Sequence, residues 1–173
     1  MEPLRAEYRV VPMELIDCND YNANEMRPEQ YRRLVQEIKE HGMLSGVLLF
    51  EKASGRYEIV DGEHRFLAAR EAGIKEIPAF VLSRRPTRAE QMQLTIKLNS
   101  LRGHWNKEKL RDNVLELMAL DEEGLKGLTQ IDADIRKQYE ALTKVQTEEA
   151  KQAVGEAERE KRLMAKVEKL IKD

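Results

Sequence analysis

The chain has 173 residues, a formal net charge of −2, 36% charged residues and 5% aromatic residues, which suits one compact, helix-rich domain with room for a smaller unit. A net charge this close to zero does not indicate a nucleic-acid partner, because a basic surface would have to be local. The sequence has no run of about twenty apolar residues and no signal-peptide pattern, so we expect no membrane span. Its single cysteine, Cys18, excludes an internal disulfide. We therefore expect a cytoplasmic protein.

The first predicted strand lies at residues 8–12, where YRVVP is rich in β-branched residues. A polar loop follows at residues 17–28, with the sequence DCNDYNANEMRP. Asn and Asp side chains bond to nearby backbone groups and favour turns. Turn chemistry alone can therefore account for most of the polarity of this loop.

A helix is predicted over residues 29–41, where apolar residues recur at helical spacing, and Gly42 ends it. The apolar run at residues 47–51 has the length of a buried strand. The turn at residues 53–55 links it to a strand at residues 57–61, which predicts a hairpin.

The strand at residues 57–61 leads directly into a helix predicted over residues 63–72. Gly62 allows a sharp turn between them, and the free N–H groups of the first helical turn carry a partial positive charge that suits a phosphate. His64 and Arg65 lie in this turn, where cations are unfavourable against the helix dipole unless an anion compensates them. The pattern predicts either an anion site or a structural turn, and the His-Arg pair favours the anion site.

Gly73 closes this helix, and residues 77–82 predict the next strand. The motif DGEHR at residues 61–65, with Ala68, Ala69, Ala72-Gly73 and Ile77-Pro78 after it, resembles the shared signature of the ParB/sulfiredoxin superfamily. In that superfamily the turn binds the phosphates of a nucleotide, CTP in ParB proteins and ATP or ADP in sulfiredoxins and free serine kinases. The resemblance implies a nucleoside triphosphate, CTP or ATP, as cofactor, bound through Gly62, Glu63, His64 and Arg65. Glu63 stands where sulfiredoxins have their reactive cysteine, which excludes peroxiredoxin repair.

Two segments nearer the N-terminus resemble further parts of the same family. Asn22-Ala23-Asn24 is similar to an Asn-x-Asn box that lies over the nucleotide, so the resemblance implies contacts from Asn22 and Asn24. Gly42, Met43 and Leu44 belong to a segment that borders the base and ribose in the family. For Met43 and Leu44, the alternative is that both are only core residues.

Thr87 and Glu90 form a capping box, which predicts a helix over residues 88–100. A second amphipathic helix is predicted over residues 107–118. Between them, Trp105 is suited either to stacking on a base or to anchoring a core or interface.

The end of the first of these helices resembles the third ParB box, Glu-Asn-x-x-Arg, which holds metal and phosphates. Asn99 and Arg102 stand where that box has its Asn and Arg. Leu98 replaces the acid that is linked to metal binding and hydrolysis. This departure weighs against triphosphate hydrolysis and leaves nucleotide binding open.

The helical pattern breaks at residues 121–124, so we place a nucleotide-binding domain at residues 1–120 and a helical extension at residues 121–173. Residues 129–132 start one helix of the extension, and Thr147 caps a last helix. The short apolar stripe of that helix needs a partner, because isolated helices are marginal in water. It either folds back on the domain or pairs with a second chain, and we expect a homodimer through the C-terminal helices.

Together the predicted elements form an α/β (α+β) fold, a small mixed sheet with packed helices of the ParB/sulfiredoxin type, followed by a helical extension. Near the expected phosphate site, Asp61, Glu63 and Asn99 are candidates for holding Mg²⁺, a cation that prefers oxygen ligands.

Three functions compete for this fold. The favoured one is a ParB-like nucleotide-binding module of partition type, in which CTP or ATP changes how two copies associate near DNA. The second is a phosphotransfer enzyme resembling the free serine kinases, with Asp61 or Glu63 as catalytic base. The third, a metal-dependent nuclease, would need more converging carboxylates than the sequence offers.

Sequence-specific DNA binding is not expected, because the chain lacks helix-turn-helix spacing after Met118. Looser contact with DNA phosphates remains open, although such a basic cluster is also typical of a solvated face. The basic residues concerned are Arg84, Arg85, Arg88, Arg102, Lys107 and Lys109.

Overall fold

The computed structural model describes residues 3–100, 104–130 and 132–172. Its larger sheet has five strands in the order β1-β6-β4-β5-β2. Their bounds are Ala6–Pro12 (β1), Ile16–Asp17 (β2), Val47–Glu51 (β4), Tyr57–Asp61 (β5) and Glu76–Leu82 (β6). The β1–β6 and β4–β5 pairs are antiparallel, whereas the β6–β4 and β5–β2 pairs are parallel. The predicted mixed sheet is therefore confirmed.

Three short strands were not predicted. One is β2, and the other two are β3 (Asn24–Glu25) and β7 (His104–Trp105), which pair antiparallel in a second small sheet. Each has two residues, which is too short for a pattern of alternating polarity to be recognised.

Most of the predicted helices are present, and their first and last residues agree with the expected signals to within a few residues, except in the C-terminal region. Their bounds are Pro28–His41 (α1), Glu63–Glu71 (α2), Arg88–Asn99 (α3), Lys107–Leu120 (α4), Glu122–Thr129 (α5) and Ala133–Lys172 (α6), with a short 3₁₀ turn at Met13–Leu15. The capping box at the start of α3 is confirmed, because the Thr87 hydroxyl accepts a bond from the Glu90 N–H and the Glu90 carboxylate accepts one from the Thr87 N–H.

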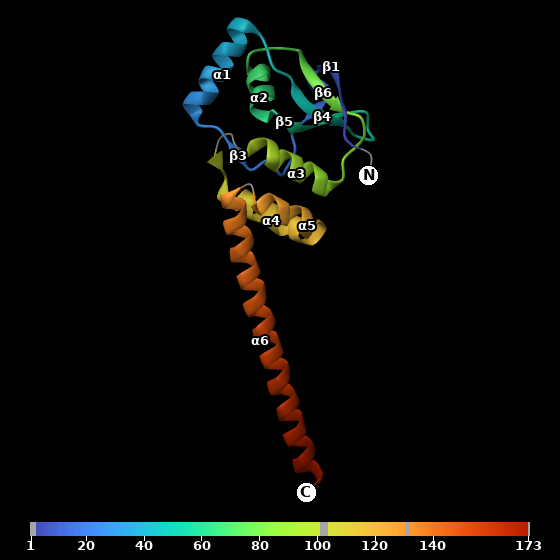
Figure 1. The fold of residues 1–173 in the computed structure, drawn as a ribbon, viewed down its shortest axis with the longest axis vertical. Helices are drawn as coiled ribbons and strands as arrows, with labels where there is room; N and C mark the ends of the chain where they lie inside the picture. Colours follow the sequence, from blue (N-terminus) through green and yellow to red (C-terminus); the bar gives the residue numbers. More distant parts are fainter. Residues whose placement is uncertain (1–2, 101–103, 131, 173) are drawn as a thin grey trace.

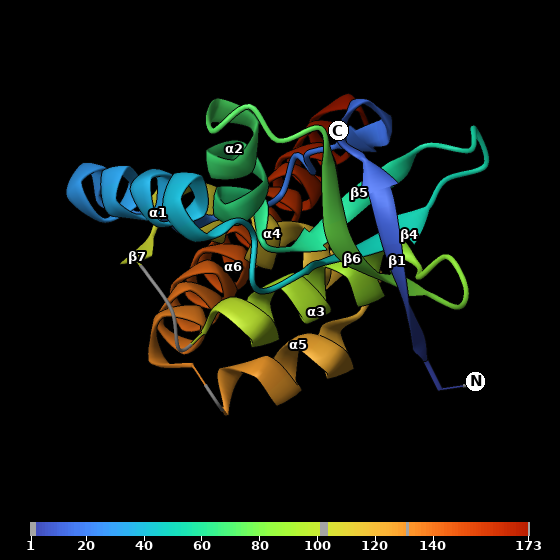
Figure 2. The ribbon, with the colours of Figure 1, turned by 90° about the horizontal axis from the view of Figure 1, so that it is seen from above.

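Helices cover both faces of the larger sheet, with α1 and α2 on one side and α3 on the other (Figure 2). The first core cluster lies under α1 and α2, where Val35, Ile38 and Phe66 pack against strand residues such as Leu49 and Ile59. Because α2 spans the connection from β5 to β6, this packing fixes the position of its N-terminus at the end of β5.

Helix α3 connects the sheet to a second layer of helices (Figure 1). Leu94 packs against the cluster on the second face of the sheet, and the Thr95 hydroxyl donates a 2.8 Å hydrogen bond to the Val60 carbonyl. Met92 and Ile96 of the same helix belong to the second core cluster, whose other buried members are Tyr21, Ala23, Leu110, Val114, Leu117, Leu125, Leu128, Ile135 and Leu142. This cluster joins residues on both sides of residue 120, and the division of the chain there stays a prediction.

The C-terminal region differs from the sequence prediction in two places. Residues 121–124 do not simply interrupt the helices, because the Asp121 carboxylate accepts a bond from the Gly124 N–H and caps α5. The last helix does not start at Thr147, because α6 is continuous from Ala133 and the Thr147 hydroxyl donates to the Thr143 carbonyl one turn earlier. That part of the prediction is wrong. Beyond its first turns, α6 extends away from the rest of the molecule (Figure 1).

Within the described residues, no helix has the combination of length and apolar composition needed to cross a lipid bilayer.

Candidate functional site

The junction between β5 and α2 requires a glycine. Gly62 has φ 97° and ψ 22°, in the left-handed region, and is the N-cap of α2. A Cβ atom at this position would lie 2.8 Å from Nη2 of Arg65 and 2.9 Å from Cγ1 of Val47. Only glycine meets both conditions without a shift of its neighbours.

The N-terminal residues of α2 line a pocket. The first backbone bond of the helix runs from the Phe66 N–H to the Gly62 carbonyl at 2.9 Å, so the N–H groups of Glu63, His64 and Arg65 precede the hydrogen-bonded ladder. Among the described residues, no side chain caps this end. Amides in this position attract anions.

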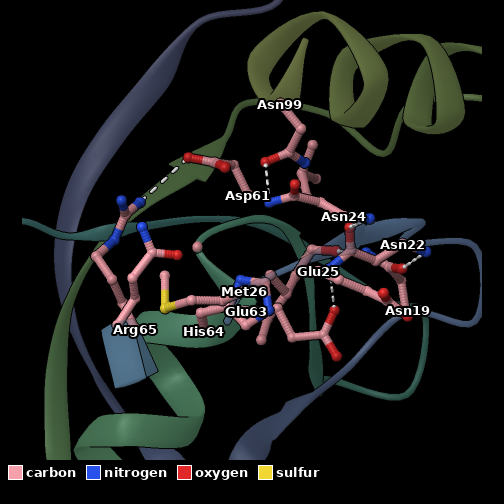
Figure 3. A pocket seen from close by; sticks show the side chains of 14 residues that line it. Asn19, Asn22, Asn24, Glu25, Met26, Asp61, Glu63, His64, Arg65 and Asn99 are labelled. Carbon is pink, nitrogen blue, oxygen red and sulfur yellow. Dashed lines mark hydrogen bonds and ion pairs between the residues drawn. The ribbon is translucent and has the colours of Figure 1, made fainter. Parts of the chain in front are cut away.

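The pocket has a volume of about 210 Å³. It collects eight of the residues predicted from the sequence, namely Asn22, Asn24, Asp61, Gly62, Glu63, His64, Arg65 and Asn99. They come from the loop after β2, from the β5–α2 junction and from the end of α3, and most are drawn in Figure 3.

Arg65 is held at the wall of the pocket. Its Nη2 donates to Oδ2 of Asp61 at 3.1 Å (Figure 3). The same atom donates to the Gly46 carbonyl at 3.1 Å. Its Nε is buried and has no hydrogen-bond partner within the described part of the chain. The Asp61 carboxylate compensates the guanidinium, which explains how a cation is tolerated in the first turn of a helix.

His64 also lies in the first turn of α2, where a cation is unfavourable, and its neutral form avoids that cost. Burial lowers the pKa of the His64 imidazole, and the nearby charge of Glu63 only partly opposes this effect. At neutral pH the ring is therefore mainly uncharged, and it faces the pocket as a polar group that can gain a proton when an anion binds.

Asparagine side chains cross-link the three segments that line the pocket. Asn22 donates through Nδ2 to the Glu63 carboxylate at 2.5 Å, and Asn24 donates through Nδ2 to Oδ1 of Asn99 at 3.3 Å (Figure 3). Asn99 in turn donates to the Thr95 carbonyl at 2.9 Å. Oδ1 of Asn24 is buried and has no partner among the described residues, so this pocket contains an acceptor that a ligand can satisfy.

The segment at Gly42, Met43 and Leu44 lies in a second pocket of about 230 Å³. This second pocket adjoins the first through Arg65, which lines both. Met43 packs against the first core cluster, whereas Leu44 is 87% exposed. The alternative that both are only core residues therefore does not hold for Leu44.

Two further residues predicted near the site have different outcomes. Arg102 lies outside the described residues. Trp105 packs against the second core cluster, and its Nε1 donates to the Asp132 carboxylate at 3.2 Å, which favours the core anchor over base stacking.

Sequence reasoning missed several residues that line the first pocket, among them Asn19, Glu25, Met26 and Gln30. Asn19 donates to the Ile59 carbonyl at 2.8 Å and accepts a bond from the Asn22 N–H at 2.7 Å. Its place in the same polar loop as Asn22 was a usable signal. The position of Gln30, in the first turn of α1, offered none.

A family model for the ParB N-terminal domain matches residues 4–99. The chain belongs to this family. It is 34% identical to a probable chromosome-partitioning protein ParB of Pseudomonas putida over 76 residues, which cover 43% of this chain and 26% of that protein. It is also 34% identical to a probable chromosome 2-partitioning protein ParB of Deinococcus radiodurans over 140 residues, which cover 69% of this chain and 46% of that protein. The chain thus spans less than half the length of either ParB relative.

Solved ParB structures have the same fold. The C-terminally truncated chromosome-partitioning protein ParB from Caulobacter crescentus, complexed with CTP-γ-S, matches with a TM-score of 0.50 and 26% identity, over 79% of this chain and 79% of that chain. A pNOB8-like ParB N-domain matches with a TM-score of 0.59 and 15% identity, over 80% of this chain and 65% of that chain, and supports the fold alone. The predicted membership of the ParB/sulfiredoxin superfamily is confirmed by these findings.

Proposed function

We propose that this domain binds CTP in the pocket at the N-terminus of α2 and acts as a nucleotide-dependent module of a partition-type protein. The observation that carries the proposal is the N-terminal end of α2, which has no side-chain cap among the described residues and lies in a pocket together with His64 and Arg65. This arrangement suits a polyphosphate. CTP is preferred over ATP because the Caulobacter relative was solved with a CTP analogue.

The two adjoining pockets suit the two ends of one nucleotide. Sites for small organic ligands span about 300–1,000 Å³, so each pocket alone is below this range, whereas the two together fall within it. The phosphates would lie at the α2 end, and the base and ribose would lie toward Gly42, Met43 and Leu44.

Mg²⁺ would accompany the triphosphate. The predicted candidates Glu63, Asp61 and Asn99 line the pocket together with Asn24, whose buried Oδ1 has no partner among the described residues. Carboxylate and amide oxygens are the ligand type that this ion prefers. Within the described residues, no group of three His, Cys, Asp or Glu side chains is placed to hold a metal. The protein would therefore supply few ligands, and Mg²⁺ would add charge neutralisation between the phosphates.

A catalytic role for Asp61 or Glu63 stays a prediction. Asp61 is paired with Arg65, and Glu63 accepts a bond from Asn22. Both carboxylates thus have structural partners, which favours nucleotide binding over phosphate transfer as the primary activity.

The proposed DNA contact would involve a narrower set of cations than the sequence suggested. Arg84 pairs with Glu90 at 2.7 Å, and Arg88 pairs with Glu116 at 2.8 Å and with Asp20 at 2.7 Å. Arg85, Lys107 and Lys109 remain as candidates for loose contact with phosphates, and such binding would weaken steeply with added salt.

Isothermal titration of the full chain with CTP, ATP, GTP, UTP and ADP in the presence of Mg²⁺ tests the proposed function. CTP should bind most tightly, and a ligand at 100 times its Kd should add about 2.7 kcal/mol to the free energy of unfolding.

Arg65→Ala should reduce CTP affinity at least about tenfold, because Arg65 lines both pockets. Arg70→Ala on the same helix is the matched control, since Arg70 lies outside both pockets and over the Phe66 ring. Absence of binding by all five nucleotides to the folded wild type would rule the proposal out.

A further inference from the structure

Strand β1 has an unpaired outer edge within the described structure. It is the terminal strand of the five-stranded sheet and pairs with β6 on one side. Its first five residues, Ala6 to Val10, are all exposed. An exposed strand edge offers a row of backbone donors and acceptors to another strand.

The register of β1 identifies which backbone groups face outward. The Arg5 carbonyl accepts a bond from the Ser83 N–H at 2.8 Å, and the Met13 N–H donates to the Lys75 carbonyl at 2.9 Å. In an antiparallel ladder, hydrogen-bonded residues alternate along the strand. The odd-numbered residues of β1 therefore bond to β6, and Ala6, Tyr8 and Val10 direct their N–H and C=O groups outward.

An apolar patch adjoins this edge. Tyr8 and Val10 are 63% and 56% exposed, and Phe80 on β6 is 46% exposed. Tyr8 and Phe80 are register partners, with ring centroids 6.0 Å apart at an interplanar angle of 71°. The outer edge thus combines open backbone groups with apolar side chains that a second strand can cover.

We propose that β1 pairs antiparallel with β1 of a second copy of this chain, about a two-fold axis at Tyr8, so that the two sheets become one continuous sheet. Tyr8 then faces Tyr8 of the second copy, and Ala6 faces Val10, as hydrogen-bonded pairs. The two aromatic pairs form a row across the junction, which adds contacts between the facing rings.

The charges on β1 select this register. With Tyr8 at the axis, Glu7 of each copy lies opposite Arg9 of the other, in a non-hydrogen-bonded pair whose side chains approach closely. A shift of the axis to Glu7 would place two carboxylates opposite each other, and a shift to Arg9 would place two guanidinium groups opposite each other. Like charges directly opposite are destabilising, so one of the three neighbouring registers is favoured.

The occupant is a second copy because the edge is complementary to itself. A two-fold interface requires each surface to supply both halves of every contact, and β1 supplies the acid, the base and the alternating backbone groups. Within one copy, Arg9 pairs with Glu7 at 3.2 Å and with Glu51 at 3.8 Å, and these surface pairs can exchange at little cost. A single strand pair buries a small area, so the association should be weak and reversible.

Disulfide trapping between two different variants tests the register. Both are made in the full chain with Cys18→Ser, because Cys18 is exposed, and one carries Glu7→Cys while the other carries Arg9→Cys. Cysteines opposite each other can bridge, whereas residues offset by two positions are about 7–8 Å apart, beyond the limit of about 7 Å for a disulfide. An equimolar mixture under mild oxidation should form the mixed disulfide at least about tenfold faster than either variant alone forms its own.

Charge reversal provides a second, cysteine-free measurement. In sedimentation velocity of the full chain, Glu7→Arg and Arg9→Glu should each weaken association at high concentration, and the double reversal should restore it. Circular dichroism melts confirm that each variant is folded. Faster trapping by a single variant than by the mixture would overturn the register, and a lack of trapping in the folded mixture would overturn the interface.

Discussion

Gly62 is the residue on which the geometry of the pocket depends. Its left-handed backbone turns the chain from β5 into α2, and the absence of a Cβ leaves room for Arg65 and Val47. His64 and Arg65 follow at once, so a change at Gly62 affects both the helix end and the two basic side chains beside it.

Gly62→Ala should therefore lower both stability and CTP affinity, the latter at least about tenfold, because the new methyl group displaces Arg65. Gly73→Ala is the matched control, since Gly73 has φ 81° but no atom of the described residues lies within 4 Å of its Cβ position. The backbone strain alone should cost roughly 1–2 kcal/mol, measured by urea unfolding, and leave CTP titration unchanged. Equal loss of affinity in both variants would contradict the prediction.

The pH dependence of binding belongs to His64. Burial lowers its pKa below the ordinary value of 6.5, and a bound triphosphate should raise that pKa, so binding should take up a proton. Affinity should then gain a favourable contribution as pH falls from about 8 toward 6. The γ-phosphate also gains a proton in this pH range and would change the affinity of both proteins. The contribution of His64 is therefore the difference between wild type and His64→Gln in how CTP affinity, measured by titration calorimetry, varies with pH. Parallel curves would show that His64 does not face the phosphates.

Helix α3 is the element that joins the sheet to the helical layer, and it also delivers Asn99 to the pocket. Its start is fixed by the capping box of Thr87 and Glu90, which Arg84 extends through an ion pair at 2.7 Å. Weakening the start of α3 should therefore lower the free energy of unfolding of the whole molecule. This end of the helix is the one opposite to Asn99.

Thr87→Ala should reduce the free energy of unfolding by about 1 kcal/mol, as is typical for loss of an N-cap. Chemical denaturation with urea measures it. Ser100→Ala at the other end of α3 is a control, because its hydroxyl donates to the Lys97 carbonyl and, among the described residues, caps no N–H group. An equal loss in the control would mean that the effect is not due to capping.

The capping carboxylate should also make stability depend on pH. The hydrogen bond from Arg84, followed by the backbone bond from Thr87, lowers the pKa of Glu90 to about 2 from an ordinary 4.5. Its contribution is fully present above pH 4.5 and is lost as pH falls through about 2. Glu90→Gln should therefore be less stable than wild type at neutral pH, and urea unfolding should show the difference shrinking as the pH is lowered toward 2. A constant difference would contradict this assignment.

At the scale of the whole molecule, two surfaces are available for association, the edge of β1 and the projecting part of α6 (Figure 1). The first turns of α6 are packed, with Ile135 and Leu142 buried in the second core cluster. Beyond them Val145 and Val154 are exposed, so this part of the projecting helix is open to a partner.

We expect the full chain to dimerise through α6, as predicted from the sequence. Val145 and Val154 are about two and a half helical turns apart and so lie on opposite sides of the helix. By its spacing along the sequence, Val145 is in register with the predicted apolar stripe that begins at Leu163. Val145→Asp should therefore shift the monomer–dimer equilibrium toward monomer, as measured by sedimentation equilibrium. Val154→Asp should have little effect. Equal behaviour of the two variants would argue against this interface.

Local signals explain what the sequence by itself determined. The helix ends at Gly42 and Thr87 and the glycine turn at Gly62 depend on bonds within a few residues, and the main strands are marked by short apolar and β-branched runs. These elements appear where they were predicted. The family signature likewise lies in one continuous stretch. Thr147 is the exception, because a threonine can either cap a helix or bond back to the carbonyl four residues earlier, and the sequence does not distinguish the two.

Tertiary structure alone decided how distant segments meet. The contact of Asn24 with Asn99, the pairing of β3 with β7, and the bond from Trp105 to Asp132 join residues between 27 and 81 positions apart. Their formation depends on α3 packing between the sheet and the helical layer, since polar side chains acquire partners only after burial brings them together. The sequence thus supplied the anion-binding turn, and the packing of α3 and the polar loop made it one wall of a pocket.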